Sequence, residues 1–71
     1  MIVYRFNIYE ALEKNGFNTY KAKQTKLLSA DTMQKLKNDD TNITLKSLNN
    51  ICMLLDMQPK DIIMYKEEKE K

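Results

Sequence analysis

Few side chains in this 71-residue sequence could catalyse a reaction or hold a metal ion. There is no histidine, and the only cysteine, Cys52, lies within an apolar pattern. A cysteine acts as a nucleophile or a zinc ligand only beside a base or further ligands, so we interpret Cys52 as a core residue. Asp39 and Asp40 are adjacent acids, but acid–base catalysis needs a walled pocket, which the short polar stretch 38–43 cannot build. We therefore expect no enzyme activity, no metal site, no cofactor and no small-molecule substrate.

The remaining polar side chains are better suited to binding. Between Lys21 and Lys37 there are five lysines and one acid, Asp31, so this stretch carries a local charge of +4, whereas the whole chain carries +2. A local excess of positive charge is what contact with phosphates requires. Any one of these lysines can be explained as part of a solvated helix face. As a group they indicate contact with the backbone of a nucleic acid.

The stretch 19–38 is expected to hold these lysines on two short helices joined by a tight turn. Its apolar residues are spaced so that one faces inward from the first helix, one from the turn and two from the second helix: Ala22, Leu28, Met33 and Leu36. Asn18 and Ser29 can cap the helices 19–26 and 30–37, because their side-chain oxygens can accept from unpaired amides in the first turn.

The predicted helix 30–37 exposes one face to solvent. This face carries short and medium-length polar side chains that can reach base edges in a major groove. Gln34 can bond adenine through two hydrogen bonds, and Lys35 can reach O6 and N7 of guanine. Asp31 can be explained by the helix dipole, or it can accept from the amino group of cytosine. The predicted base contacts are Ser29, Ala30, Asp31, Gln34 and Lys35.

Apolar spacing and helix caps predict two further short helices near the ends of the domain. The first begins near Asn7, which precedes Glu10 by three residues as in a capping box, and it ends at Gly16. The last begins at Pro59, whose missing amide costs nothing in a first turn, and it places Ile62 against the core.

The most regular apolar stripe lies in a helix predicted for residues 45–55, which Thr44 would cap. The stripe consists of Leu45, Leu48, Ile51, Cys52 and Leu55, and we expect this helix to be the central buried one. The sequence has one Gly and one Pro, and so few turn-forming residues do not favour β-hairpins. The predicted fold is therefore all-α, with five short helices.

Both ends of the predicted domain, residues 1–65, carry apolar residues that the helices do not account for. Residues 1–5 fit an extended arm or the first turn of the first helix, and we favour the arm. Such an arm could pair with residues 63–65 or with a second subunit, and we expect the terminal segments to contribute to a homodimer. The segment 66–71 is charged throughout, and we expect it to be a disordered tail.

A lone cysteine cannot form an internal disulfide, and the sequence has no signal peptide and no apolar run of membrane-spanning length. We therefore expect a cytoplasmic protein that does not enter a membrane.

The register of these features resembles the lambda-repressor-like (Cro/CI, XRE-type) helix-turn-helix family, in particular its small single-domain bacterial and phage regulators. The similarity covers roughly residues 6–65 and is carried by four groups of residues: Ala22, Leu28-Ser29, Met33 and Leu36; Gly16; Leu45 to Cys52; and Gln58 to Ile62. Lys23 and Leu27 stand where the family usually has a small residue and a Gly, and Thr19 stands where a Gln is often found.

The resemblance implies sequence-specific binding of duplex DNA as a transcriptional regulator, with a repressor favoured over an activator and residues 30–37 in the major groove. It also implies that the loop after this helix contacts phosphates. Together with the lysine cluster, the predicted phosphate contacts are Thr19, Tyr20, Lys21, Lys26, Lys37, Asn38, Thr41, Asn42 and Thr44. Tyr20 could instead stack on the core.

A protein-interaction module is the competing hypothesis. The same fold could act as an antitoxin-like or regulatory partner, whose apolar C-terminal segment binds another protein and whose lysines are only solvated. The outward face of residues 30–37 distinguishes the two: an exposed basic ridge favours DNA, and occlusion by a subunit contact favours the interaction module.

Overall fold

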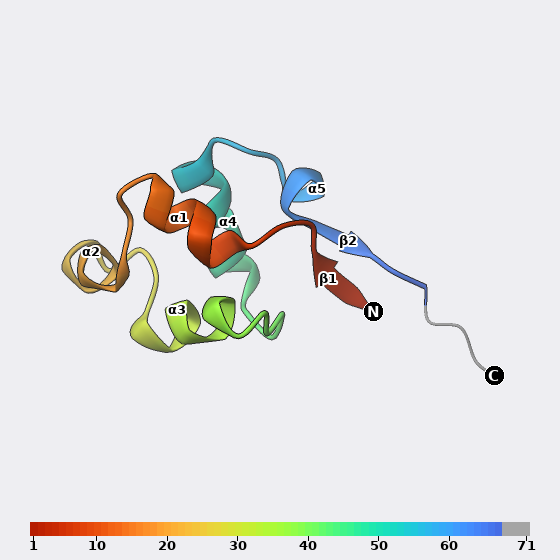
Figure 1. Cartoon of the computed structure of the whole chain (residues 1–71), viewed down its shortest axis with the longest axis horizontal. Coiled ribbons are helices and arrows are strands. Elements are labelled where there is room, and N and C mark those ends of the chain that lie inside the picture. The colour runs from red at the N-terminus through yellow and green to blue at the C-terminus, as the bar shows by residue number, and fades with distance from the viewer. Residues whose placement is uncertain (68–71) are drawn as a thin grey trace.

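The chain folds into five short helices and a two-stranded antiparallel sheet, in a computed structural model that describes residues 1–67 (Figure 1). Along the chain the elements are β1 (Ile2–Tyr4), α1 (Ile8–Lys14), α2 (Thr19–Thr25), α3 (Ala30–Lys37), α4 (Leu45–Leu55), α5 (Pro59–Ile62) and β2 (Ile63–Tyr65). The prediction of five helices around a helix-turn-helix pair is confirmed. The small sheet is an addition to the predicted all-α fold.

Local capping interactions set where four of the helices begin. The side-chain oxygens of four residues each accept a hydrogen bond from a backbone amide three positions later, as the sequence predicts: Asn7, Asn18, Ser29 and Thr44. The fifth helix begins with Pro59 after a capping box formed by Gln58 and Asp61. Gly16, with φ of +80°, follows the end of α1 in the left-handed conformation that Gly adopts at little cost.

Ten apolar side chains contributed by all five helices and the short connections between them form the core: Ile8, Leu12, Phe17, Ala22, Leu28, Met33, Leu36, Leu48, Ile51 and Ile62. Helix α3 packs against both α1 and α2, while α4 packs against α1 and α5. The core is therefore shared among the helices, and the expectation that α4 alone would be the central buried helix is too strong.

Leu45 was predicted to be part of the buried stripe, and this prediction is wrong. It is 83% exposed, whereas Leu48 and Ile51 are buried. Leu45 is the first residue of α4, so it lies one turn before Leu48 and projects past the edge of the core. Cys52 and Leu55 complete the stripe as half-buried residues.

The terminal segments pair with each other within one chain. Residues 1–5 therefore contain an extended strand and are not the first turn of α1. Ile2 lies opposite Tyr65, Val3 opposite Met64, and Tyr4 opposite Ile63. Figure 1 shows this β1–β2 ribbon at the end of the molecule away from α2.

The pairing continues beyond the two strands at both ends of the ribbon. The amide of Lys66 donates to the carbonyl of Met1 at 2.7 Å, and the amide of Arg5 donates to that of Ile62 at 2.8 Å. Lys66, the first residue of the predicted tail, is thus held by the ribbon. The rest of that prediction, from residue 68 onward, lies outside the described residues.

We predict that Met33→Asp unfolds the domain. Met33 is 1% exposed within the core, and an unpaired carboxylate there costs several kcal/mol, against a total stability of about 5 kcal/mol for a domain of this size. Thermal unfolding followed by circular dichroism would measure the loss. The matched control is Met53→Asp, because Met53 is 58% exposed on α4 and should keep a melt close to that of the parent. A cooperative melt of Met33→Asp within a few degrees of the parent would contradict the packing of α3.

Candidate nucleic-acid interface

Helix α3 presents a polar face to solvent because its two apolar residues turn inward. Met33 and Leu36 are buried in the core, and Ala30, Asp31 and Gln34 are exposed on the rest of the helix surface. Three of the five predicted base contacts are therefore on one accessible face. Ser29 is exposed as well, but its hydroxyl oxygen already accepts from the amide of Thr32 at 3.0 Å as the helix cap.

Lys35 lies differently from its neighbours on α3. It was expected to be exposed, but its side chain is only 32% exposed and turns toward the loop after the helix. The ammonium donates to the backbone carbonyl of Asn42 at 3.1 Å and lies 3.3 Å from a carboxylate oxygen of Asp31. The structure thus places Lys35 at the edge of the outward face, engaged with the protein itself.

The turn between α2 and α3 is fixed by backbone conformation and by one long-range contact. Its left-handed residue is Lys26, with φ of 61°, rather than Leu27, where the resembled family has its Gly. Leu27 instead packs half-buried against the core. From α4, the side-chain amide of Asn50 donates to the carbonyl of Leu27 at 2.8 Å. Nothing in the local sequence around Asn50 indicated this role.

An open groove of about 300 Å³ runs between the end of α2 and the start of α3. It is lined by two lysines and by small or apolar residues: Ala22, Lys23, Lys26, Leu28, Ser29 and Ala30. The groove places Lys26, a predicted phosphate contact, beside the first residues of α3. Lys23 was not among the predicted contacts, but it lines the same groove as Lys26.

The other predicted phosphate contacts on the helices lie at the start of α2 and at the end of α3. Thr19, Tyr20 and Lys21 form the first turn of α2. Tyr20 is 69% exposed, so it does not stack on the core. Lys37 and Asn38 are exposed at the other end of α3, where the Lys37 ammonium lies 5.9 Å from the centre of the Tyr9 ring, within the range of a cation–π contact.

The loop between α3 and α4 carries the last three predicted phosphate contacts. Asn42 and Thr44 are exposed, while Thr41 is half-buried. Thr44 also caps α4 by accepting from the amide of Ser47 at 3.1 Å. The loop therefore presents fewer unengaged side chains than its polar sequence suggests.

Tyr4 connects this loop to the terminal ribbon. Its hydroxyl donates to the backbone carbonyl of Asp40 at 2.7 Å. Burial of the phenol, together with the smaller effect of the nearby Asp40 and Asp39 carboxylates, raises the pKa of Tyr4 to about 12. The hydroxyl therefore keeps its proton, and can donate, throughout the neutral pH range.

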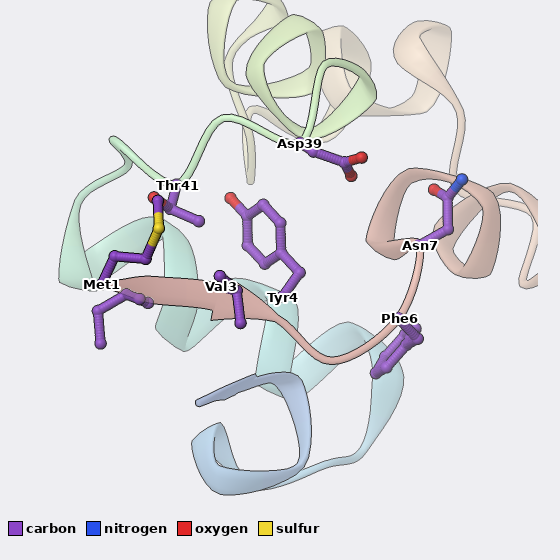
Figure 2. A pocket seen from close by; sticks show the side chains of 8 residues that line it. Met1, Val3, Tyr4, Phe6, Asn7, Asp39 and Thr41 are labelled. Atoms are coloured by element: carbon purple, nitrogen blue, oxygen red, sulfur yellow. The ribbon is translucent and has the colours of Figure 1, made fainter. Parts of the chain in front are cut away.

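A hollow lies beside β1 and the same loop (Figure 2). It measures about 330 Å³, and Figure 2 shows Tyr4, Asp39 and Thr41 around it together with Asn7 from the start of α1. The Asn7 side chain caps α1 and the Tyr4 hydroxyl is bonded to Asp40. This arrangement offers no pairing of a nucleophile with a base.

Residues 1–67 contain neither a metal-binding cluster nor a membrane-spanning helix. This part of the chain contains no group of three or more His, Cys, Asp or Glu side chains that could hold a metal ion. None of its helices has the length and apolar character needed to cross a membrane.

A family model described as a Cro/C1-type HTH DNA-binding domain matches residues 7–68, which is nearly the whole chain. No curated protein and no solved structure gave a significant match.

The left-handed conformation of Lys26 gives a prediction about stability. Because a side chain with a Cβ is strained there and Gly is not, Lys26→Gly should be more stable than Lys26→Ala by about 1 kcal/mol. Chemical denaturation of the two variants measures this difference, and both lose the same charge. At Lys21, inside α2, the order should reverse, with Gly less stable than Ala by about 1 kcal/mol. The same order at both sites would show that the turn is not left-handed at Lys26.

Proposed function

This chain belongs to the Cro/C1-type HTH DNA-binding domain family, and on that basis we propose that it binds duplex DNA at a specific sequence and regulates transcription. The observation that supports this most directly is the outward face of α3. Ala30, Asp31 and Gln34 are exposed on an eight-residue helix whose opposite side is fixed in the core. A helix of this kind can enter a major groove and read base edges.

In the proposed complex, base reading and backbone binding come from different parts of the surface. Gln34 projects into the groove, where it can form two hydrogen bonds to adenine. Lys21, Lys23 and Lys26 lie on α2 and the turn, and Asn38 and Asn42 lie after α3. These groups flank the reading face on both sides, as phosphate contacts along the two edges of a groove would.

We propose that the protein acts as a repressor. A domain bound over a promoter can block transcription by occupying the DNA, which requires no contact with another protein. Selecting bound sequences from a pool of random duplexes would identify the operator, and placing that operator in a promoter should lower reporter expression when the protein is present. Raised expression would indicate an activator instead.

Substitutions at two positions separate base contacts from phosphate contacts. Gln34→Ala should cost roughly 1–3 kcal/mol on the selected operator, relax the preference at one base pair and leave the salt dependence nearly unchanged. Lys26→Ala and Lys26→Gly should weaken binding to operator and scrambled duplexes equally, and should flatten the slope of log K against log salt by about one unit.

The measurement is binding to both duplexes over a salt series, with circular dichroism to confirm that each variant is folded. If Gln34→Ala weakens both duplexes equally, or neither, α3 does not read bases. The protein-interaction module would then be the better hypothesis.

We further propose that two copies associate through the β1–β2 ribbon. After the two strands have paired, Tyr65 is still 68% exposed, and Ile2 and Met64 are also exposed. Beside them an apolar groove of about 180 Å³ runs under β1, with Ile43, Leu45 and Leu48 among its lining residues. Val3 and Ile63 are half-buried in the ribbon, so we assign them smaller parts in the contact. An exposed apolar surface of this kind is typical of a protein interface, and a two-fold pair would suit a near-palindromic operator.

This proposal predicts a dimer that depends on Tyr65. Sedimentation of the parent at high micromolar concentration should show a dimer, and Tyr65→Lys should shift it toward monomer, because a charge would be buried in the contact. Met53→Lys is the matched control, since Met53 is a similarly exposed apolar residue on α4. A parent that remains a monomer, both with and without operator DNA, would rule out the ribbon as a dimer contact.

A further inference from the structure

The loop between α3 and α4 must be held in place by contacts other than those of a helix or strand. Residues 40–44 have no helix or strand hydrogen bonding, and Asp39 begins the loop in the left-handed conformation, with φ of 59°. This loop carries Thr41, Asn42 and Thr44, three of the proposed phosphate contacts. Contacts of that kind are effective only when their positions relative to the reading helix are fixed.

Lys35 is the side chain of α3 that holds this loop. Its ammonium donates to the Asn42 carbonyl at 3.1 Å and pairs with Asp31 at 3.3 Å. Asp31 precedes Lys35 by four residues, the favourable order for an ion pair on a helix. The pair keeps the ammonium directed toward the loop and neutralises a carboxylate on the face that is proposed to meet DNA.

The loop is also held at Asp40 by contacts on several sides. The Asp40 amide donates to the carbonyl of Lys35 at 2.8 Å, and its carboxylate accepts from the amide of Asn42 at 2.9 Å. From β1, the hydroxyl of Tyr4 donates to the Asp40 carbonyl at 2.7 Å. One ion pair and a continuous set of hydrogen bonds therefore join Asp31, Lys35, Asn42, Asp40 and Tyr4.

We infer that Lys35 is a positioning residue that sets the place of the 39–44 loop on the DNA backbone, and that it does not read a base. The inference rests on the proposed function and refines it. To reach a guanine, the ammonium would have to leave both Asn42 and Asp31. The loop would then lose the side-chain contact that holds Asn42 to the reading helix, in addition to the backbone bond that holds Asp40. Base reading then falls to Ala30, Asp31 and Gln34.

Lys35→Met tests this, because it keeps the aliphatic stem and removes the donor. In DNA-free protein, amide hydrogen exchange at Asn42 and Ile43 should speed up by about three- to tenfold, the effect of losing one hydrogen bond that orders the loop. Lys35→Arg keeps a charged donor and should restore the slow exchange. Lys37→Met is the matched control on the same helix, since the Lys37 ammonium lies over Tyr9 and away from the loop, and it should leave exchange in the loop unchanged.

The DNA measurement then separates three roles for Lys35. With a positioning role, Lys35→Met weakens operator and scrambled duplexes by the same factor, about three- to tenfold, and the preference at every base pair is kept. Loss of preference at one base pair would make Lys35 a base reader and overturn the inference. Unchanged loop exchange in the DNA-free protein would also overturn it, because a simple phosphate contact has no effect there. A parent that binds no duplex would refute the proposed function, and the exchange comparison would still decide whether Lys35 holds the loop.

Discussion

The packing of Met33 and Leu36 into the core is the interaction on which the proposed reading surface depends. An eight-residue helix is not stable alone in water, and α3 buries only these two side chains. Their contacts with the neighbouring helices fix both the position of α3 and its rotation about its own axis. Which side chains face outward is therefore decided in the core, and Ala30, Asp31 and Gln34 are among the residues of α3 that this packing leaves exposed.

The structure also holds α3 from its two ends by contacts that come from distant parts of the chain. Before the helix, Asn50 of α4 donates to the carbonyl of Leu27 in the turn. After it, Tyr4 of β1 donates to the carbonyl of Asp40. Each is a side-chain donor satisfying a loop carbonyl that no helix or strand can satisfy. The helix α4 and the terminal ribbon thus support the proposed reading helix, although no base contact is proposed for either of them.

The helices could be predicted from the sequence because a cap and its partner amide are three residues apart, and the buried residues follow the helical period. The features that could not be predicted depend on contacts between residues far apart in the sequence, or on the position of a residue at the end of a helix. Tyr4 and Asp40 are 36 positions apart. The pairing of the two terminal segments was one of two alternatives for the arm, and the sequence did not decide between them. Leu45 has the right spacing for burial but lies where α4 passes beyond the core. Lys35 has the spacing of an exposed residue, but its long side chain is flexible and bends toward the Asn42 carbonyl, to which it donates.

The small size of the reading face bears on how specificity could arise. A good bidentate contact contributes about 1–3 kcal/mol of discrimination between bases, and specific sites typically exceed non-specific DNA by about 4–10 kcal/mol. With Lys35 engaged by the loop, Gln34 is the one exposed side chain of α3 suited to a bidentate contact, and Asp31 offers a carboxylate that is already paired. A single α3 therefore supplies too little discrimination through direct contacts. Doubling the reading face through the ribbon would add a second half-site with the same contacts, and sequence-dependent bending of the DNA between the half-sites would add discrimination at base pairs that no side chain touches.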